Sequence, residues 1–237
     1  MNIADFIISL SEVEKTLKSF DLFRMRGIKS INGDGVSPQF KLASIKDDYI
    51  NAYTEGLRYN DYDFLLNDQS YFQFEFKKTD SFIDIRYAFF HNPINYITYS
   101  EYIQEQLKTF GMMESPEEIG TLLEEEYNQF LNEQDLKLNY TTIRYDSDYG
   151  NYKPLVHSVS HIHIGHSNNM RIPINKIISP LNFVLFTIKH VYYQEWKGKV
   201  KTDLDYIKER MAISKHGEQN LPNHIWDEME KIELYLN

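Results

Sequence analysis

The chain contains 237 residues, of which 42% are hydrophobic and 15% aromatic, and its formal net charge at pH 7 is −10. This composition excludes a disordered or fibrous chain and predicts a globular protein with a substantial core. The absence of cysteine excludes disulfides, thiolate metal sites and cysteine nucleophiles. The acidic balance argues against generic nucleic-acid binding but leaves a local basic patch open.

The N-terminal stretch MNIADFIISLSEVEK lacks the basic segment and the continuous apolar run of a secretion signal. No stretch of the sequence approaches the roughly 18 apolar residues that are needed to cross a bilayer. We therefore expect a soluble, cytoplasmic protein without a membrane partner. The dense basic cluster KGKVK, residues 197–201, is typical of a solvated helix start.

The first third of the chain predicts two helices. Apolar residues recur at three- and four-residue spacing over residues 3–19 and again over residues 43–58, which indicates amphipathic helices. Residues 26–39 contain three glycines and a proline. This intervening stretch therefore predicts a short strand and a turn-rich loop.

The pattern changes to a period of two in residues 71–90. Phe72, Phe74 and Phe76 alternate with other residue types, and a polar KKTDS turn leads into a second β-rich run. Pro93 cannot donate a hydrogen bond to a sheet, so it ends this region. The segment predicts a β-hairpin.

A helix start stands in the middle of the chain. Ser115 suits the N-cap, Pro116 the first helical position, and Glu118 completes a capping box. We expect this helix to continue to about residue 134. Strands are expected within residues 137–150 and 157–165.

The last third of the chain predicts three helices. Ser179 and Pro180 form a second helix start, for an apolar helix that continues through Trp196. Two amphipathic helices are expected at about residues 201–213 and 222–235.

The order of these elements lacks a regular βαβ alternation. We therefore predict an α+β fold in which a mostly antiparallel sheet packs against several helices, with helical N- and C-terminal parts. One domain spanning residues 1–237 is expected, with a subdomain boundary near residues 111–115 as the alternative.

Four of the eight histidines fall within ten residues, in the stretch HSVSHIHIGH at 157–166. Side chains alternate along a strand, so His161 and His163 share one face. Two neighbouring imidazoles can chelate a divalent ion if a third ligand joins them, and His166 lies just beyond a glycine that could turn it back. The alternative is that these histidines bond to backbone or carboxylate groups in a half-buried sheet.

Arg171 supports a second interpretation of the same region. Its guanidinium could bind a carboxylate or phosphate next to His161 and His163, which gives an anion pocket without a metal. Equally, Arg171 could pair internally with Asp146 or Asp148 of the preceding strand.

A weaker signal is Glu75-Phe-Lys77, the Glu-x-Lys half of a restriction-type nuclease site. Such a site needs acidic residues to hold Mg²⁺ while the lysine orients the attacking water. Asp61, Asp63 and Asp68 lie upstream as candidate ligands. An exposed charge pair on a strand is the alternative.

Five short motifs are spread over most of the chain: YAFFHNP at 87–93, IRYDSD at 143–148, SHIHIG at 160–165, RIP at 171–173 and SPLNFVLF at 179–186. Together they resemble a bacterial family catalogued as domain of unknown function 2290. The resemblance implies a bacterial origin and one domain, and it transfers no catalytic role. It directs attention to His161, His163, Arg171 and Asp146 as one constellation.

Three functions remain open on these grounds. The first is a binding or effector component of a multi-protein system, by analogy one of phage defence, with a protein partner or a second copy of the chain bound by aromatic side chains. The second is a phosphodiesterase or nuclease, with His161, His163, Arg171 and Asp146 as catalytic residues and a divalent metal held by His161, His163 and His166. The third is a nucleotide or small-anion sensor with its pocket at Arg171.

Overall fold

The computed structural model describes residues 1–29, 35–45, 49–78, 83–94, 97–110, 123–133, 140–166 and 170–236. The chain divides into two compact units. The first unit combines Met1–His91 with Thr141–Asn237, and the second is Asn92–Tyr140. The alternative boundary at residues 111–115 lies outside the described residues, and the expectation of one domain stays a prediction.

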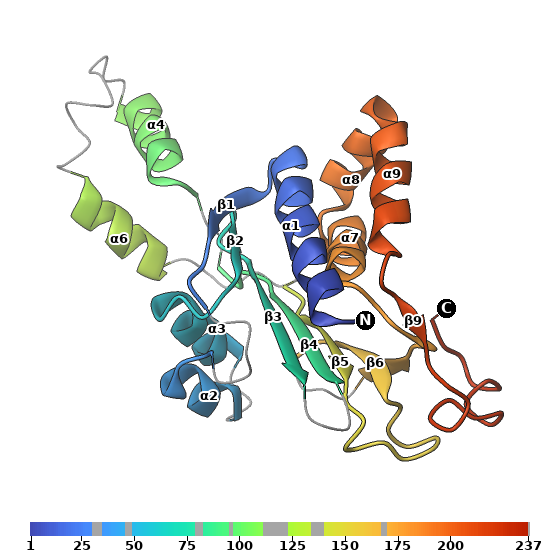
Figure 1. The fold of residues 1–237 in the computed structure, drawn as a ribbon. Coiled ribbons are helices and arrows are strands. Elements are labelled where there is room, and N and C mark those ends of the chain that lie inside the picture. The colour runs from blue at the N-terminus through green and yellow to red at the C-terminus, as the bar shows by residue number, and fades with distance from the viewer. Residues whose placement is uncertain are drawn as a thin grey trace. The chain divides into compact units, whose positions relative to one another are not determined.

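The described part of the first unit contains a sheet of seven antiparallel strands, each hydrogen-bonded to its neighbours in the sequence (Figure 1). This sheet and the helices around it confirm the predicted α+β class. The strands are β1 (Phe23–Arg26), β2 (Phe64–Leu66), β3 (Tyr71–Lys78), β4 (Ile83–Phe90), β5 (Ile143–Ser147), β6 (Ser160–Ile164) and β7 (Met170–Pro173).

The predicted hairpin is confirmed as β3 and β4, which pair from Tyr71 and Phe90 to Lys78 and Ile83. Phe72, Phe74 and Phe76 all point to one face of the sheet and are buried, because successive side chains of a strand alternate between its faces. We call this side of the sheet the core face and the opposite side the polar face.

Two helices cover the core face, α1 (Ile3–Ser19) and α7 (Pro180–Val191), and they pack against each other (Figure 1). The Phe6 ring of α1 contacts the rings of Phe76 and Tyr87. Phe183 of α7 contacts Phe74 and Tyr87. The helix predicted over residues 3–19 is therefore confirmed, and its apolar stripe forms the core.

The helix start at Ser179 is confirmed, since its hydroxyl accepts a hydrogen bond from the Asn182 N–H. The prediction that this helix continues through Trp196 is wrong, because α7 ends at Val191 and α8 (Tyr193–Thr202) follows. Tyr192 leaves the helical backbone conformation, and its buried hydroxyl donates to Asp68 at 2.9 Å. The break in the helix therefore coincides with a tertiary hydrogen bond.

The helix expected at about residues 201–213 is confirmed as α9 (Leu204–Ser214), but the helix predicted over residues 222–235 is wrong. That segment consists mainly of turns, in which Asp227 Oδ1 accepts hydrogen bonds from the N–H groups of Met229 and Glu230. Such bonds compete with helical ones. The Glu230 side chain is fully buried and accepts a hydrogen bond from Tyr152, so a tertiary contact overrides the apolar spacing.

A second, two-stranded sheet joins two segments that are distant in the sequence. It consists of β8 (Lys176–Ile177) and β9 (Gln219–Asn220), which pair antiparallel. None of the helices in the described ranges is long and apolar enough to cross a membrane.

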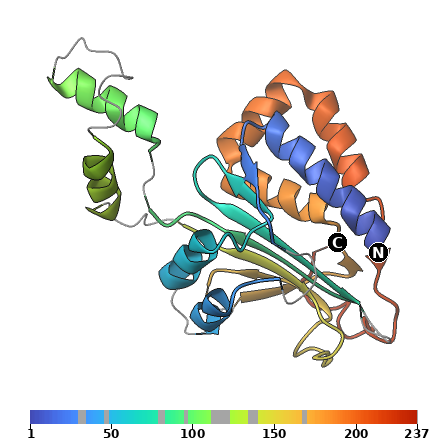
Figure 2. The same cartoon turned by 60° about the vertical axis from the view of Figure 1, so that its left-hand side comes forward.

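The polar face of the sheet carries α2 (Pro38–Ile45) and α3 (Tyr49–Arg58), on the side away from α1 and α7 (Figure 2). The sequence predicted a single helix at residues 43–58 in their place. The predicted start is wrong, because α2 begins at Pro38. Ser37 caps α2, because its hydroxyl accepts a hydrogen bond from the Phe40 N–H, and Pro38 takes the first helical position.

The second unit contains α4 (Tyr99–Phe110) and α6 (Glu124–Glu133). The Tyr102 ring of α4 packs on Tyr127 and Phe130 of α6. The helix predicted to reach about residue 134 includes α6. Its proposed start at Ser115, Pro116 and Glu118 lies outside the described residues.

Candidate functional site

Charged and polar side chains from four neighbouring strands form a row on the polar face. Glu75 of β3 lies opposite Arg86 of β4 in the sheet register. Asp146 of β5 lies between Arg86 and His161 of β6. Residues paired across strands share one face, so these four side chains are neighbours although they come from distant parts of the sequence.

A second row lies two residues further along the strands. Arg144 of β5 pairs with His163 of β6, and His163 pairs with Arg171 of β7. The two rows together place three arginines, one aspartate, one glutamate and two histidines on the same side of the sheet.

Asp146 is the centre of this arrangement and binds two arginines. Its Oδ1 accepts a hydrogen bond from Arg86 Nε at 2.9 Å, and its Oδ2 accepts one from Arg144 Nε at 2.7 Å. The Asp146 side chain is 9% exposed, whereas the side chains of Arg86 and Arg144 are 60% and 31% exposed. Two cationic groups therefore cover one buried carboxylate, which leaves a net charge of about +1.

The imidazoles of His161 and His163 point toward each other and toward Asp146. Their Nε2 atoms are 3.0 Å apart, and His163 Nε2 lies 3.3 Å from Asp146 Oδ2. His161 Nε2 lies 4.0 Å from the same oxygen. Both histidines are buried. The two Nε2 atoms and Asp146 Oδ2 form a compact cluster of potential metal-ligand atoms.

The hydrogen bonds fix the tautomer of His161. Its Nδ1 lies 2.8 Å from the carbonyl oxygen of Ser158, which can only accept, so Nδ1 carries the proton and Nε2 has a free lone pair. Burial lowers the pKa of His161 to about 4. The ring is therefore neutral at pH 7.

Asp146 keeps its charge despite its burial. Burial raises the pKa of this carboxyl, but the hydrogen bond from His163 and the charges of Arg144 and Arg86 lower the pKa by more. The pKa of Asp146 consequently lies below its usual range, and the group is a carboxylate at any pH near neutral.

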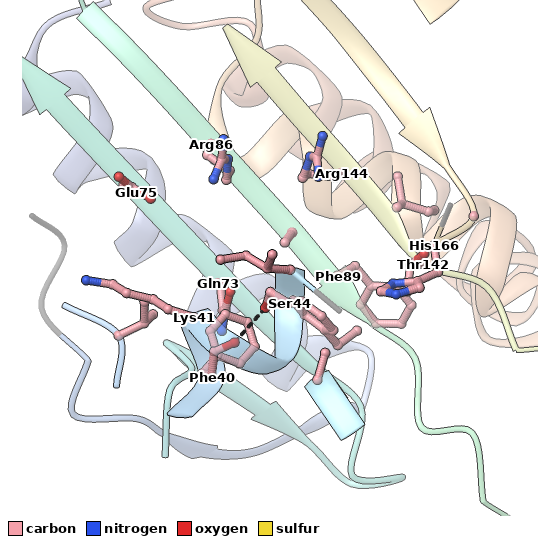
Figure 3. Close-up of a pocket in the computed structure, with 17 residues that line it drawn as sticks. Phe40, Lys41, Ser44, Gln73, Glu75, Arg86, Phe89, Thr142, Arg144 and His166 are labelled. Atoms are coloured by element: carbon pink, nitrogen blue, oxygen red, sulfur yellow. Dashed lines mark hydrogen bonds between the residues drawn. The ribbon is translucent and has the colours of Figure 1, made fainter. Parts of the chain in front are cut away.

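A cavity of about 500 Å³ opens on the polar face beside these rows (Figure 3). Arg86 and Arg144 lie side by side in its wall, with Glu75 on the next strand and Lys41 of α2 across from them. The rest of its wall is largely apolar and includes Val36, Phe40, Ile45, Ala88, Phe89, Phe90 and Ile143. Volume and lining are typical of a small-molecule site.

An aromatic layer holds α2 and α3 over this cavity. Phe40 and Tyr49 pack against Phe90 with ring centres 5.6 and 6.3 Å apart. Tyr53 stacks on Tyr71 at 5.6 Å. Gly56 of α3 makes this approach possible, since a Cβ atom there would lie 2.2 Å from the Tyr71 hydroxyl oxygen.

A smaller cavity of about 310 Å³ lies on the other side of Arg86 and Asp146. Its four carboxylates outnumber its two cationic groups, so it is the less suitable of the two cavities for an anion. The charged residues that line it are Glu75, Lys77, Asp84, Arg86, Asp146 and Asp148.

The structure separates His166 from His161 and His163. Gly165 has a φ of +86°, a conformation that favours glycine, and the chain turns there. The His166 ring lies 5.4 Å from that of Tyr49 and lines the larger cavity. Asp146 takes the position in the cluster that the sequence pattern assigned to His166.

Arg171 shares the polar face with His163 but is exposed, and it lines neither of the two cavities described above. The ion pairs to Asp146 come from Arg86 and Arg144 instead. The described residues show no ion pair between Arg171 and Asp146, and the anion-binding role expected of Arg171 stays a prediction.

The nuclease-type residues do not assemble around one point. Glu75 and Lys77 lie on the polar face, but the upstream aspartates have structural partners. Asp61 accepts hydrogen bonds from Ser37, and Asp63 accepts one from the Phe74 N–H. Asp68 binds Ser70.

Sequence reasoning missed Arg86, Arg144 and Lys41. The two arginines carry a usable signal, because Arg86 follows Asp84 at a strand spacing of two and Arg144 precedes Asp146 in the same way. Lys41 carries no such signal, since tertiary contacts such as that of Phe40 with Phe90 bring α2 to the cavity.

Comparison with known protein families shows the family of the chain. A model of a family described as an uncharacterized conserved protein, DUF2290, matches residues 19–234, which include every residue of the site. Searches of the curated proteins and of the solved structures found no match. The chain therefore belongs to the family of uncharacterized conserved proteins DUF2290.

Proposed function

We propose that the chain binds a small organic anion, of the class of nucleotides and other phosphorylated metabolites, in the larger cavity. The observation that carries this proposal is a cluster of cationic side chains, Lys41, Arg86 and Arg144, in a largely apolar cavity of a protein with a net charge of −10. Glu75 is the one carboxylate among the described lining residues. The charge of the cavity wall is therefore positive although the net charge of the protein is negative.

The two arginines are arranged to bind a further anion. Each uses its Nε atom for Asp146, and among the described residues their Nη atoms have no hydrogen-bond partner. Asp146 holds both guanidinium planes in place. A phosphate group could accept paired hydrogen bonds from such fixed forks.

The apolar part of the wall favours an organic ligand over inorganic phosphate. Phe40 and Phe90 offer aromatic surface, and the volume of about 500 Å³ suits a ligand with a ring system. Burial of that ring would add free energy of binding that a bare phosphate cannot gain.

Binding fits the geometry better than hydrolysis. His161 and His163, the expected acid and base, are 3% and 1% exposed and do not line the larger cavity. A general acid or base must come within hydrogen-bond reach of the substrate. The phosphodiesterase or nuclease alternative stays a prediction.

A calorimetric titration tests the proposal, after a thermal-shift screen of nucleotides and phosphorylated metabolites has supplied a ligand. Arg144→Gln should weaken binding about tenfold or more, because a hydrogen bond to a charged group contributes about 1.5–3 kcal/mol. Arg171→Gln is the matched control, since it removes an arginine on the same face outside the cavity, and it should leave the affinity unchanged.

Two results would contradict the proposal. One is a screen in which no phosphorylated compound stabilises the fold, because a ligand at 100 times its dissociation constant should add about 2.7 kcal/mol. The other is an equal loss of affinity in Arg144→Gln and Arg171→Gln, which would place the ligand elsewhere.

A role as an effector subunit with a protein partner, such as one in phage defence, stays a prediction that rests on aromatic content and analogy. The anion pocket is compatible with it, since a bound nucleotide could control an assembly. Co-purification of the chain with the products of neighbouring genes, with and without the ligand, measures this directly.

A further inference from the structure

We infer that Asp146, His161 and His163 bind one divalent transition-metal ion of the zinc class. The inference goes beyond the proposed function and does not rest on it, because none of these three residues lines the larger cavity. Within the described residues this is the cluster in which two imidazoles and a carboxylate converge.

The three ligand atoms have the spacing that a small ion requires. Their separations are 3.0 Å between the two Nε2 atoms, and 3.3 and 4.0 Å from Asp146 Oδ2 to those of His163 and His161. Zinc lies about 2.0–2.1 Å from histidine nitrogens in a tetrahedral site, so its ligand atoms are roughly 3.3–3.4 Å apart. Shifts of a few tenths of an ångström would complete three corners of a tetrahedron.

Two hydrogen-bond acceptors compete for one proton at the centre of the cluster. His161 Nε2 is an acceptor because Nδ1 donates to Ser158, and Asp146 Oδ2 is also an acceptor. The His163 Nε2 proton has to serve both, at 3.0 and 3.3 Å. An ion at this point would take the place of this proton, which would move to His163 Nδ1, and would then be bound by one lone pair from each of the three atoms.

Neighbouring groups orient the ligands. The Ser158 carbonyl fixes the ring of His161, as backbone carbonyls commonly do for metal-bound histidines. Arg86 and Arg144 fix the plane of the Asp146 carboxylate. Because Nδ1 of His161 donates to the Ser158 carbonyl, its Nε2 atom can bind an ion without losing a proton.

Two features limit the affinity. The charges of Arg86 and Arg144 repel a dication, and His163 Nδ1 is buried without a partner among the described residues. If Nε2 binds the ion, Nδ1 carries the proton and lacks an acceptor. We therefore expect weaker binding than at a four-ligand structural zinc site.

The donor set determines which ions suit the site. Two imidazoles and one carboxylate favour Zn²⁺, Co²⁺, Ni²⁺ or Fe²⁺. Mg²⁺ and Ca²⁺ prefer sites built of oxygen ligands, so neither should compete.

Equilibrium dialysis of the full chain against Zn²⁺ and Co²⁺ tests the inference. The wild type should bind one ion, and Co²⁺ should develop the visible absorption of a low-coordinate histidine complex. His163→Gln should weaken binding by roughly a hundredfold or more, since even loss of an outer-shell partner costs 10–100-fold. His166→Gln is the comparison variant, and it should retain the ion because the structure places that ring outside the cluster.

A second measurement covers the case in which His163→Gln fails to fold. In the wild type, Zn²⁺ should shift the ring-nitrogen NMR resonances of two histidines, which His161→Gln and His166→Gln assign. The inference is overturned if the wild type binds no stoichiometric ion, if His163→Gln binds as tightly as the wild type, or if only His166→Gln loses the ion. Nucleotide binding is measured separately and does not bear on these outcomes.

Discussion

The two faces of the central sheet use the same strands for different purposes. On the core face, side chains such as Phe74, Tyr87 and Phe183 are fully buried and contact one another through their rings. On the polar face, Arg86 and Asp146 of neighbouring strands form an ion pair beside a cavity. Because side chains alternate along a strand, the buried core and the row of charged groups are encoded in alternate residues of one segment.

The polar face also contains buried groups, but these depend on one another. Asp146, His161 and His163 are as buried as many core residues. A buried charge is tolerated only where it is paired and hydrogen-bonded. The core face should therefore respond to lost volume, whereas the polar face should respond to changes in charge and pH.

The largest expected effect lies on the core face. Phe74→Ala should lower the free energy of unfolding by about 3–5 kcal/mol, because it leaves a cavity among the surrounding rings. Lys77→Ala, an exposed position on the polar face of the same strand, should change it by less than about 0.5 kcal/mol. Urea denaturation measures both, and similar losses would contradict the assignment of the two faces.

The second effect tests the charge cluster. Asp146→Asn should lower the free energy of unfolding by about 2–3 kcal/mol at pH 7, because Arg86 and Arg144 lose their shared carboxylate while the side chain keeps its size. The folded pKa of Asp146 lies below its unfolded value of about 3.9, so its contribution is present above about pH 4 and is lost as the pH falls toward the folded pKa.

Urea denaturation at several pH values between about 2 and 7 checks this prediction. The Asn variant should show a shallower loss of stability below pH 4 than the wild type. Parallel curves for the two proteins would mean that Asp146 is not held as a carboxylate by the arginines.

The third effect concerns His161. Its pKa is about 4 in the folded protein and about 6.5 in an unfolded chain, so the unfolded state binds more protons between these values. Stability from the buried neutral ring is thus complete above about pH 6.5 and is lost as the pH falls toward about 4, at no more than about 1.4 kcal/mol per pH unit. His161→Gln should remove this dependence, whereas the exposed His224→Gln should keep it.

The smallest effect tests the aromatic layer over the cavity. Gly56→Ala should destabilise by about 1 kcal/mol, because overpacking against the Tyr71 hydroxyl outweighs the better helix propensity of alanine. Gly198→Ala on α8 is the matched control, since no atom lies within 4 Å of its added Cβ. That control should stabilise the fold by about 0.5–1 kcal/mol in a thermal melt. Equal shifts would mean that α3 does not pack closely on β3.

Local signals in the sequence were reliable where a short segment decides its own structure. The helix start at Ser179 and the alternation of Phe72, Phe74 and Phe76 both predicted the observed elements. The same Ser-Pro signal stands at Ser37 and Pro38, where α2 begins, and it would have corrected the boundary of that helix. These features depend on backbone groups a few residues apart.

Predictions failed where a distant contact decides. The apolar spacing of residues 222–235 indicates a helix, but buried Glu230 binds Tyr152 from the loop between β5 and β6. The helix after Ser179 is interrupted at Tyr192, whose hydroxyl binds Asp68. In both cases a buried polar side chain forms a hydrogen bond with a residue far away in the sequence. Helix propensity contributes too little free energy to outweigh such a bond.

The sequence by itself determined that His161 and His163 share one face, because the strand period of two follows from local backbone geometry. Only the tertiary structure decided that Asp146 joins them, that Arg86 and Arg144 rather than Arg171 bind this carboxylate, and that His166 lies elsewhere. These outcomes depend on the register between strands that are distant in the sequence, such as those of Arg86 and Asp146, which are 60 residues apart. They also depend on the turn at Gly165. Packing of the whole sheet sets that register, and a pattern within one segment cannot contain it.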